Sequence, residues 1–216
     1  MLKENKGKFI ISSIIILLPI LIGILLWDKL PETMVTHWDA NGVPNGYSPK
    51  AFVVFGMPLL LFAMQFLCIW FMQFSNKTVT QNKQAKAIIF WIIPVVSALA
   101  MGATYALALG KEINLAVIGP LFAGLLFIVV GNYLPKVKQN WVLGIRLPWT
   151  LQDEENWNKT HRLAGKVWVV CGFIMLLTAL TSGKVAFTIM MILLFFMIGV
   201  PSVYSYKLYQ KSVKEE

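Results

Sequence analysis

The sequence has few charged residues and few cysteines. Only 13% of its 216 residues are Asp, Glu, Lys or Arg, whereas 57% are apolar, and the mean hydropathy is +0.68. These values exclude an ordinary soluble domain and indicate a membrane protein. The two cysteines, Cys68 and Cys171, lie in apolar runs without the C-x-x-C spacing of a redox or metal site, so we interpret them as packing residues.

Familiar enzyme motifs are also missing. The sequence contains no H-E-x-x-H, no G-x-S-x-G, no P-loop and no G-x-G-x-x-G. Acid–base chemistry on lipid headgroups by Glu154, Glu155 and His161 stays open as an alternative, although no nucleophile or metal set completes that constellation. We therefore predict no catalytic residue, no metal and no cofactor.

Six apolar runs are long enough to cross about 30 Å of hydrocarbon at about 1.5 Å per residue. The first run is longer than the apolar part of a signal peptide and lacks a small-x-small cleavage site after it, so we expect it to be retained as a span. The predicted fold is an all-α membrane protein, with three spans in residues 1–109 and three in 110–216. The runs are 9–27, 51–74, 87–109, 115–134, 167–181 and 185–206.

The interiors of these runs contain no Asp, Glu, Lys, Arg or His. Proton- and ion-driven carriers usually keep such groups near mid-membrane, despite an insertion cost of roughly 3 kcal/mol each. The sequence therefore disfavours a transporter. Functional chemistry is expected instead in the two substantial loops.

The basic residues predict the orientation. Of the 19 lysines and arginines, 15 fall on the side that carries both termini and the segments 75–86 and 135–166. The positive-inside rule then places both termini in the cytoplasm, and His37 and His161 on opposite faces of the membrane. We interpret the net charge of +9 as a topology signal and an attraction to anionic membrane lipids, with no direct binding of nucleic acid.

The loop on the outer side, "LPETMVTHWDANGVPNGYSPK", combines a short β-prone stretch at 34–38 with turn signals at "DANG", "VPNG" and "SPK". We expect a small outer cap over residues 28–50, with few residues of regular structure. His37, Trp38, Asp39 and Tyr47 are its candidate ligand contacts. The alternative is that the two aromatic residues only anchor the interface and that Asp39 only closes a turn.

The inner loop contains "LGIRLPWTLQDEENWNKTHRLAG". Thr150 followed by Asp153 predicts a helix that starts at about Leu151 and runs into the fifth span, forming a helical elbow. On it, Glu155 and Lys159 are spaced to pair, while Arg146 can turn back toward the carboxylates or toward lipid phosphates. Two faces are predicted, one of Trp157, His161, Ala164 and Trp168 and one of Glu154, Asn158 and Arg162. An interfacial elbow without any partner remains the alternative.

Both loops resemble one known family. The outer loop is similar to the extracytoplasmic module LP-x-x-x-x-x-HW-x-x-x-G-x-P-DGY found at the amino-terminal end of many SdpI family proteins. The segment "GNYLPKVKQNWVLGIRLPWTLQDEENWNKTHRLAG" is similar to that family's carboxyl-terminal signature, which contains G-(I/L)-R-T-PWTL-x-x-E-x-x-W-x-x-x-x-R. Together with the six spans, the resemblance covers nearly the whole chain.

The resemblance implies immunity of a bacterium to a secreted membrane-active peptide toxin of the sporulation-delay type. It also suggests sensing, in which the toxin-bound protein draws a cytoplasmic transcriptional repressor to the membrane. A membrane receptor without immunity activity stays open as an alternative. Two residues depart from the family pattern, Leu147 for Thr and Asn45 for Asp.

The resemblance also assigns weight to matching residues in both loops. Outside they are His37, Trp38, Gly42, Gly46 and Tyr47; inside they are Gly131, Asn132, Pro135, Asn140, Gly144, Arg146, Pro148, Trp149, Thr150, Glu154, Trp157 and Arg162. We further predict that Arg146 and Glu154 form a structural clamp in the elbow.

Overall fold

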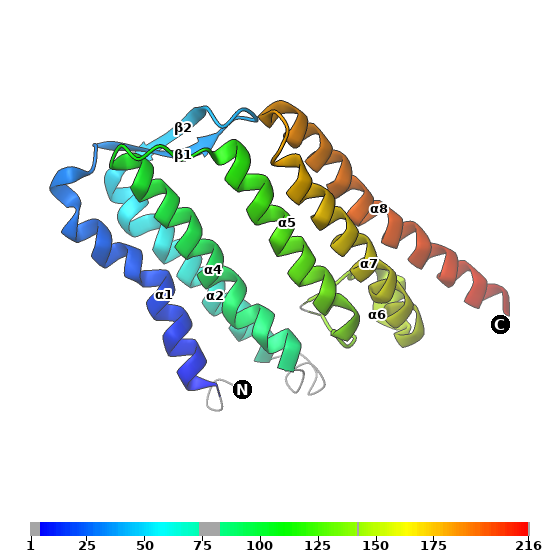
Figure 1. Cartoon of the computed structure of the whole chain (residues 1–216). Coiled ribbons are helices and arrows are strands. Elements are labelled where there is room, and N and C mark those ends of the chain that lie inside the picture. The colour runs from blue at the N-terminus through cyan, green and yellow to red at the C-terminus, as the bar shows by residue number, and fades with distance from the viewer. Residues whose placement is uncertain (1–4, 74–82, 142, 216) are drawn as a thin grey trace. The chain divides into compact units, whose positions relative to one another are not determined.

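The computed structural model of the chain describes residues 5–73, 83–141 and 143–215 (Figure 1). Within these ranges, six helices are long and apolar enough to cross a membrane, which confirms the predicted all-α, multi-pass membrane fold. The helices are α1 (Lys6–Leu25), α2 (Met57–Gln73), α4 (Lys83–Ala108), α5 (Leu115–Tyr133), α7 (Glu154–Thr178) and α8 (Gly183–Glu215).

The chain divides into two compact units. The first contains Met1–Phe74 and Lys86–Leu115, so it holds α1, α2 and nearly all of α4. The second is built mainly on Ala116–Glu216 and holds α5, α7 and α8. Each unit therefore has three of the long helices.

The helices of the first unit pack closely around a glycine on α1. The Tyr105 hydroxyl on α4 donates a hydrogen bond to the carbonyl oxygen of Pro19 on α1 at 2.7 Å. A Cβ atom on Gly23 would lie 2.6 Å from that hydroxyl and 2.6 Å from Val54 Cγ1. Gly23 thus lets α1 approach both α4 and the π-helical turn η2 (Phe52–Gly56).

A β-hairpin, part of what we call the cap (residues 27–50), precedes η2 and α2. It pairs β1 (Thr33–Trp38) with β2 (Pro44–Pro49) in antiparallel fashion. Met34 is 1% exposed and packs with Leu30, Val53, Val54, Met101 and Tyr105, so the hairpin is fixed to the helices by a shared apolar core.

The expectation of few regular residues in the cap is wrong, because a second strand covers the predicted turns "VPNG" and "SPK". Pro44 and Pro49 lie at the two ends of β2. Proline lacks an N–H but is tolerated at strand ends and on edge strands, and both strands of a two-stranded sheet are edges. The strand at 34–38 and the turn role of Asp39 are confirmed, since Asp39 Oδ1 accepts the N–H groups of Asn41 and Val43 at 2.8 and 2.9 Å.

In the second unit, α5 and α7 meet along glycines spaced seven residues apart on each helix. A Cβ atom on Gly172 would lie 2.7 Å from the carbonyl oxygen of Gly124, and one on Gly165 would lie 2.7 Å from that of Gly131. Seven residues are about two helical turns, so each pair lies on one face of its helix. The backbones therefore approach more closely than helices with larger side chains permit.

Helix α7 also packs against α8. The indole N–H of Trp168 donates to the carbonyl oxygen of Met197 at 3.0 Å. Cys171, Met175, Leu193 and Met197 form a buried cluster beside this bond, which agrees with the predicted packing role of Cys171. Helix α7 is consequently the element to which both neighbours in this unit are joined.

The predicted helix start at Leu151 is wrong. The short helix α6 (Pro148–Gln152) ends before Asp153, whose backbone is extended, and α7 begins at Glu154. Asp153 Oδ1 accepts the N–H groups of Glu155 and Asn156 at 2.7 and 3.2 Å, so Asp153 is the N-cap. Thr150, which the sequence suggested for that role, is used inside the elbow instead.

Replacing Gly172 with Ala should destabilise the second unit. The new Cβ would collide with backbone atoms of α5, so we expect a loss of about 1–3 kcal/mol in the free energy of unfolding. The matched control is Gly119→Ala on α5, because a Cβ atom there meets nothing within 4 Å. Thermal unfolding of both variants in one detergent tests this; equal midpoints would contradict the close approach.

Candidate functional site

The elbow, residues 134–166, leads from the 3-10 turn η3 (Leu134–Lys136) through α6 into α7. Its centre is the indole of Trp157, which is fully buried and donates from Nε1 to the carbonyl oxygen of Val137 at 2.8 Å. The imidazole of His161 stacks on this indole with ring centroids 4.0 Å apart. The predicted face of Trp157, His161, Ala164 and Trp168 is turned inward: the first three residues are buried and Trp168 is partly buried.

Both ring nitrogens of His161 are engaged by the protein. The backbone N–H of Ile145 donates to Nε2 at 3.0 Å, and Nδ1 lies 2.8 Å from the carbonyl oxygen of Trp157. Because Nε2 accepts a hydrogen bond, the proton must be on Nδ1, where it is donated to Trp157. His161 is thus neutral and acts as a bridge between α7 and the preceding loop.

Gly144 makes room for this bridge. Its φ of +105° lies in the left-handed region that favours glycine, and a Cβ atom there would collide with His161 Nε2 and approach the Trp157 ring at 3.0 Å. The weight given to Gly144 therefore has a steric basis: any larger residue would displace the imidazole.

Two further polar residues fold the loop before α6. Asn140 Oδ1 accepts the N–H of Leu143 at 2.7 Å, which closes a turn. The buried Thr150 hydroxyl accepts the N–H of Leu147 at 2.9 Å and lies 2.8 Å from the carbonyl oxygen of Ile145. Leu147 takes part in this bond through its backbone N–H. The bond therefore does not require the side-chain hydroxyl of the threonine that the family pattern has at position 147.

Asn156 joins the elbow to α8 and was missed in the sequence analysis. Its Nδ2 donates to the carbonyl oxygen of Ser205 at 2.9 Å, while its Oδ1 accepts the hydroxyls of Ser205 and Thr160 at 2.7 and 3.0 Å. All three side chains are buried. The available signal was the i,i+4 spacing of Asn156 and Thr160 next to the buried Trp157 and His161, which predicts polar groups facing inward.

Other predicted residues of this segment point outward. Asn132, Arg146, Pro148, Glu154 and Arg162 are exposed. The guanidinium of Arg146 donates to the carbonyl oxygen of Trp141 at 2.8 Å. Glu154, Asn158 and Arg162, which were predicted to share a face, are all exposed.

Among the described residues, Arg146 and Glu154 are not joined by an ion pair, and the clamp stays a prediction. In the part of the second unit that the structure describes, the ion pair joins Lys159 to Glu155 at 2.6 Å, as their i,i+4 spacing predicted. Arg146 is held by a backbone carbonyl instead. Along the chain, the two residues are separated by the short helix α6, and Glu154 is the first residue of α7.

The acid–base constellation of Glu154, Glu155 and His161 is not assembled. The His161 nitrogens are used within the elbow, Glu155 pairs with Lys159, and Glu154 is exposed. Among the described residues, no group of three or more His, Cys, Asp or Glu is arranged to hold a metal ion. The geometry gives this constellation no shared reacting position.

We call the buried, stacked side chains of Trp157 and His161 the Trp157 core. Trp149 packs instead against α8. Its ring centroid is 5.3 Å from that of Tyr206 and 6.0 Å from that of Tyr209, both on α8. These contacts form a second connection between the elbow and α8, beside that made by Asn156. The carboxyl-terminal part of α8 is therefore held by α6 and α7 together.

The cap brings its predicted residues onto one hairpin. His37 Nδ1 lies 2.6 Å from Asn45 Oδ1, so the Asn that replaces the family's Asp is a direct partner of His37. A Cβ atom on Gly46 would lie 2.7 Å from His37 Cβ, and Gly42 has a φ of +77° in the turn. Tyr47 is 61% exposed and Trp38 is partly buried, so Tyr47 is the aromatic side chain that the hairpin offers to a ligand.

Lys50 fixes the base of the cap. It is 6% exposed, and its Nζ donates to the carbonyl oxygens of Trp27 and Leu30 at 3.2 and 3.4 Å and to Glu32 at 2.9 Å. The same ammonium lies 4.6 Å from the centre of the Trp27 ring. This lysine was not among the predicted site residues; its charge is used to tie the end of α1 to the start of α2.

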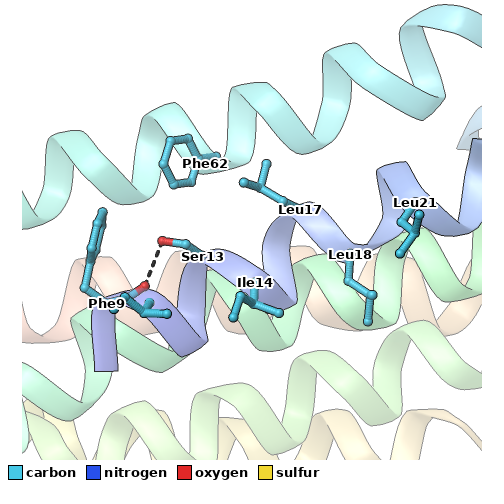
Figure 2. Close-up of a pocket in the computed structure, with 8 residues that line it drawn as sticks. Phe9, Ser13, Ile14, Leu17, Leu18, Leu21 and Phe62 are labelled. Atoms are coloured by element: carbon cyan, nitrogen blue, oxygen red, sulfur yellow. Dashed lines mark hydrogen bonds between the residues drawn. The ribbon is translucent and has the colours of Figure 1, made fainter. Parts of the chain in front are cut away.

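An apolar groove of about 470 Å³ runs along α1 in the first unit, with Phe62 of α2 as its other wall (Figure 2). Its polar residue, Ser13, donates its hydroxyl proton to the carbonyl oxygen of Phe9 at 2.7 Å. The groove therefore accepts hydrocarbon and has little capacity to select a polar ligand.

Comparison with known proteins assigns these regions to a family. The model described as the SdpI/YfhL protein family matches residues 136–205, and that described as a domain of unknown function (DUF1648) matches residues 14–62. The chain is 31% identical to the immunity protein SdpI of Bacillus subtilis (strain 168) over 207 residues, covering 94% of this chain and 97% of the other. The chain belongs to the SdpI family. No solved structure matches it.

Each matched region includes one of the two loops together with parts of the neighbouring helices. The SdpI family match begins in the elbow and extends through α7 into α8, so it includes the Trp157 core and the Asn156 connection. The DUF1648 match contains the whole cap together with parts of α1 and α2. This SdpI family member thus carries both regions in which candidate residues were predicted.

Thr150→Val should loosen the elbow. The substitution keeps the side-chain shape but leaves the N–H of Leu147 without its acceptor, so we expect a loss of about 1–3 kcal/mol in the free energy of unfolding. Thr150→Ser keeps the hydroxyl and is the matched control. Thermal unfolding in one detergent compares them, and a Val variant as stable as the Ser variant would contradict the anchoring role.

Proposed function

We propose that the chain is a membrane immunity protein that protects a bacterium from a secreted, membrane-active peptide toxin. The observation that carries this proposal is the similarity to the immunity protein SdpI along almost the full length of both chains. Apolar runs whose interiors contain no Asp, Glu, Lys, Arg or His agree with a protein that binds an apolar peptide and does not pump it.

Both termini are proposed to lie in the cytoplasm, since 15 of the 19 basic residues fall on their side. The cap then faces outward, where a secreted peptide arrives, and the elbow faces inward. The exposed Tyr47 and the neighbouring exposed Val43 give the cap an apolar contact surface for the peptide.

The elbow is proposed to report the bound peptide to the cytoplasm. The buried residues of the elbow fix the conformation of the loop. Arg146, Glu154 and Arg162 are exposed and are not part of the Trp157 core. An exposed surface with both charge signs suits recruitment of a cytoplasmic transcriptional repressor through protein contacts, with no direct contact to nucleic acid.

The direct test is survival of a toxin-sensitive bacterium that expresses the chain, challenged with a sporulation-delay-type peptide. We expect growth where an empty-vector strain dies, at membrane levels of the chain verified by immunoblot. Killing of both strains at normal levels of the chain would refute protection from this peptide.

Arg146→Ala tests the role of the exposed elbow. The variant loses one charge-assisted contact between Arg146 and a bound partner. We expect this loss to reduce protection or repressor recruitment by about tenfold or more, while the amount of the chain in the membrane is unchanged. Lys138→Ala is the matched control, because Lys138 is basic, exposed and in the same loop. Survival and co-purification of a repressor are the two readouts; wild-type values for both would remove Arg146 from the functional surface.

A further inference from the structure

A polar pocket of about 190 Å³ lies between the start of α7 and the carboxyl-terminal end of α8, outside the Trp157 core. Its walls come from two helices of the same unit. The lining residues are Asp153, Glu155, Asn156, Lys159, Leu208, Lys211 and Ser212.

The two walls of this pocket are fixed to each other. The buried side chain of Asn156 is hydrogen bonded to both the carbonyl oxygen and the hydroxyl of Ser205, one turn before Leu208. Trp149 packs against Tyr206 and Tyr209 on the same helix. The pocket is therefore a preformed feature of the α7–α8 contact, which lowers the cost of binding a ligand there.

The charges in the pocket are balanced. Asp153 and Glu155 contribute two carboxylates, and Lys159 and Lys211 contribute two ammonium groups. The Lys159 and Glu155 side chains are paired, yet 48% and 73% exposed, so both remain within reach of a ligand. A lone phosphate would gain the lysines but be repelled by the carboxylates, whereas a zwitterion satisfies both signs.

The position along α8 points to lipid. The apolar run 185–206 is about 33 Å long as a helix, so it spans the hydrocarbon and ends near its edge. Leu208, Lys211 and Ser212 follow by two to six residues, about 3 to 9 Å further on, which is the depth of the headgroups. Trp149, Tyr206 and Tyr209 lie at the same level, as interfacial aromatic residues do.

We propose that this pocket binds the headgroup of a zwitterionic phospholipid with a primary amine, of the phosphatidylethanolamine type. The phosphate lies against Lys159 and Lys211, and the ammonium group donates hydrogen bonds to Glu155 and Asp153. A choline headgroup has the same charges but no N–H to donate, so the pocket discriminates against it.

The test is native mass spectrometry of the full chain from micelles that contain phosphatidylethanolamine, phosphatidylcholine and phosphatidylglycerol in equal amounts, with matched acyl chains. We expect phosphatidylethanolamine to be retained about tenfold more than either other lipid. Equal retention of the three, or preference for phosphatidylglycerol, would overturn the proposal.

Variants assign the preference to the pocket. Lys211→Gln and Glu155→Gln should each reduce the preference to near unity, with thermal midpoints close to that of the wild type. Lys207→Gln is the matched control, because Lys207 is exposed on the same end of α8 and does not line the pocket. If either pocket variant is too unstable to measure, Lys159→Gln, which removes the other proposed phosphate contact, replaces it. A preference that survives the pocket variants would overturn the assignment.

Discussion

The fully buried indole of Trp157 is the feature on which the geometry of the elbow depends. Its N–H fixes the chain leaving α5 through Val137, its ring supports His161, and His161 accepts the N–H of Ile145. One side chain thereby organises the chain before and after it. Breaking any of these bonds would leave a buried polar group without a partner, which costs free energy. This cost favours a single conformation of the loop.

This arrangement divides the family signature into two classes of residue. Gly144, Thr150 and Trp157 face inward, where they fix the backbone, and their substitution acts first on stability. Arg146 and Glu154 are exposed, so we expect their substitution to act first on binding. The distinction matters for mutational data, since loss of protection has different meanings for the two classes.

Composition predicted the six spans because a helix that crosses hydrocarbon needs a long uncharged run, which is visible in any sequence. Faces of α7 were also predictable from helical spacing. The helix break at Asp153 was not, because Thr150 and Asp153 both suit an N-cap and only the bond from Thr150 back to Leu147 decides between them. Pairing of Asn156 with Ser205 joins residues 49 apart in sequence, which local patterns do not specify. The strand β2 was missed for another reason: its sequence, PNGYSP, consists mostly of residues typical of turns.

We propose that this SdpI family protein acts by binding a membrane-active peptide. Binding of a fluorescent toxin peptide to the purified chain in bilayer nanodiscs tests it most directly. We expect saturable binding of the peptide to the chain. Truncating the Tyr47 side chain of the cap should weaken this binding, and empty nanodiscs should show none once partitioning of the peptide into lipid is subtracted. If the chain still protects cells, but nanodiscs that contain it take up no more peptide than empty nanodiscs do, protection does not depend on peptide binding and the proposal is wrong.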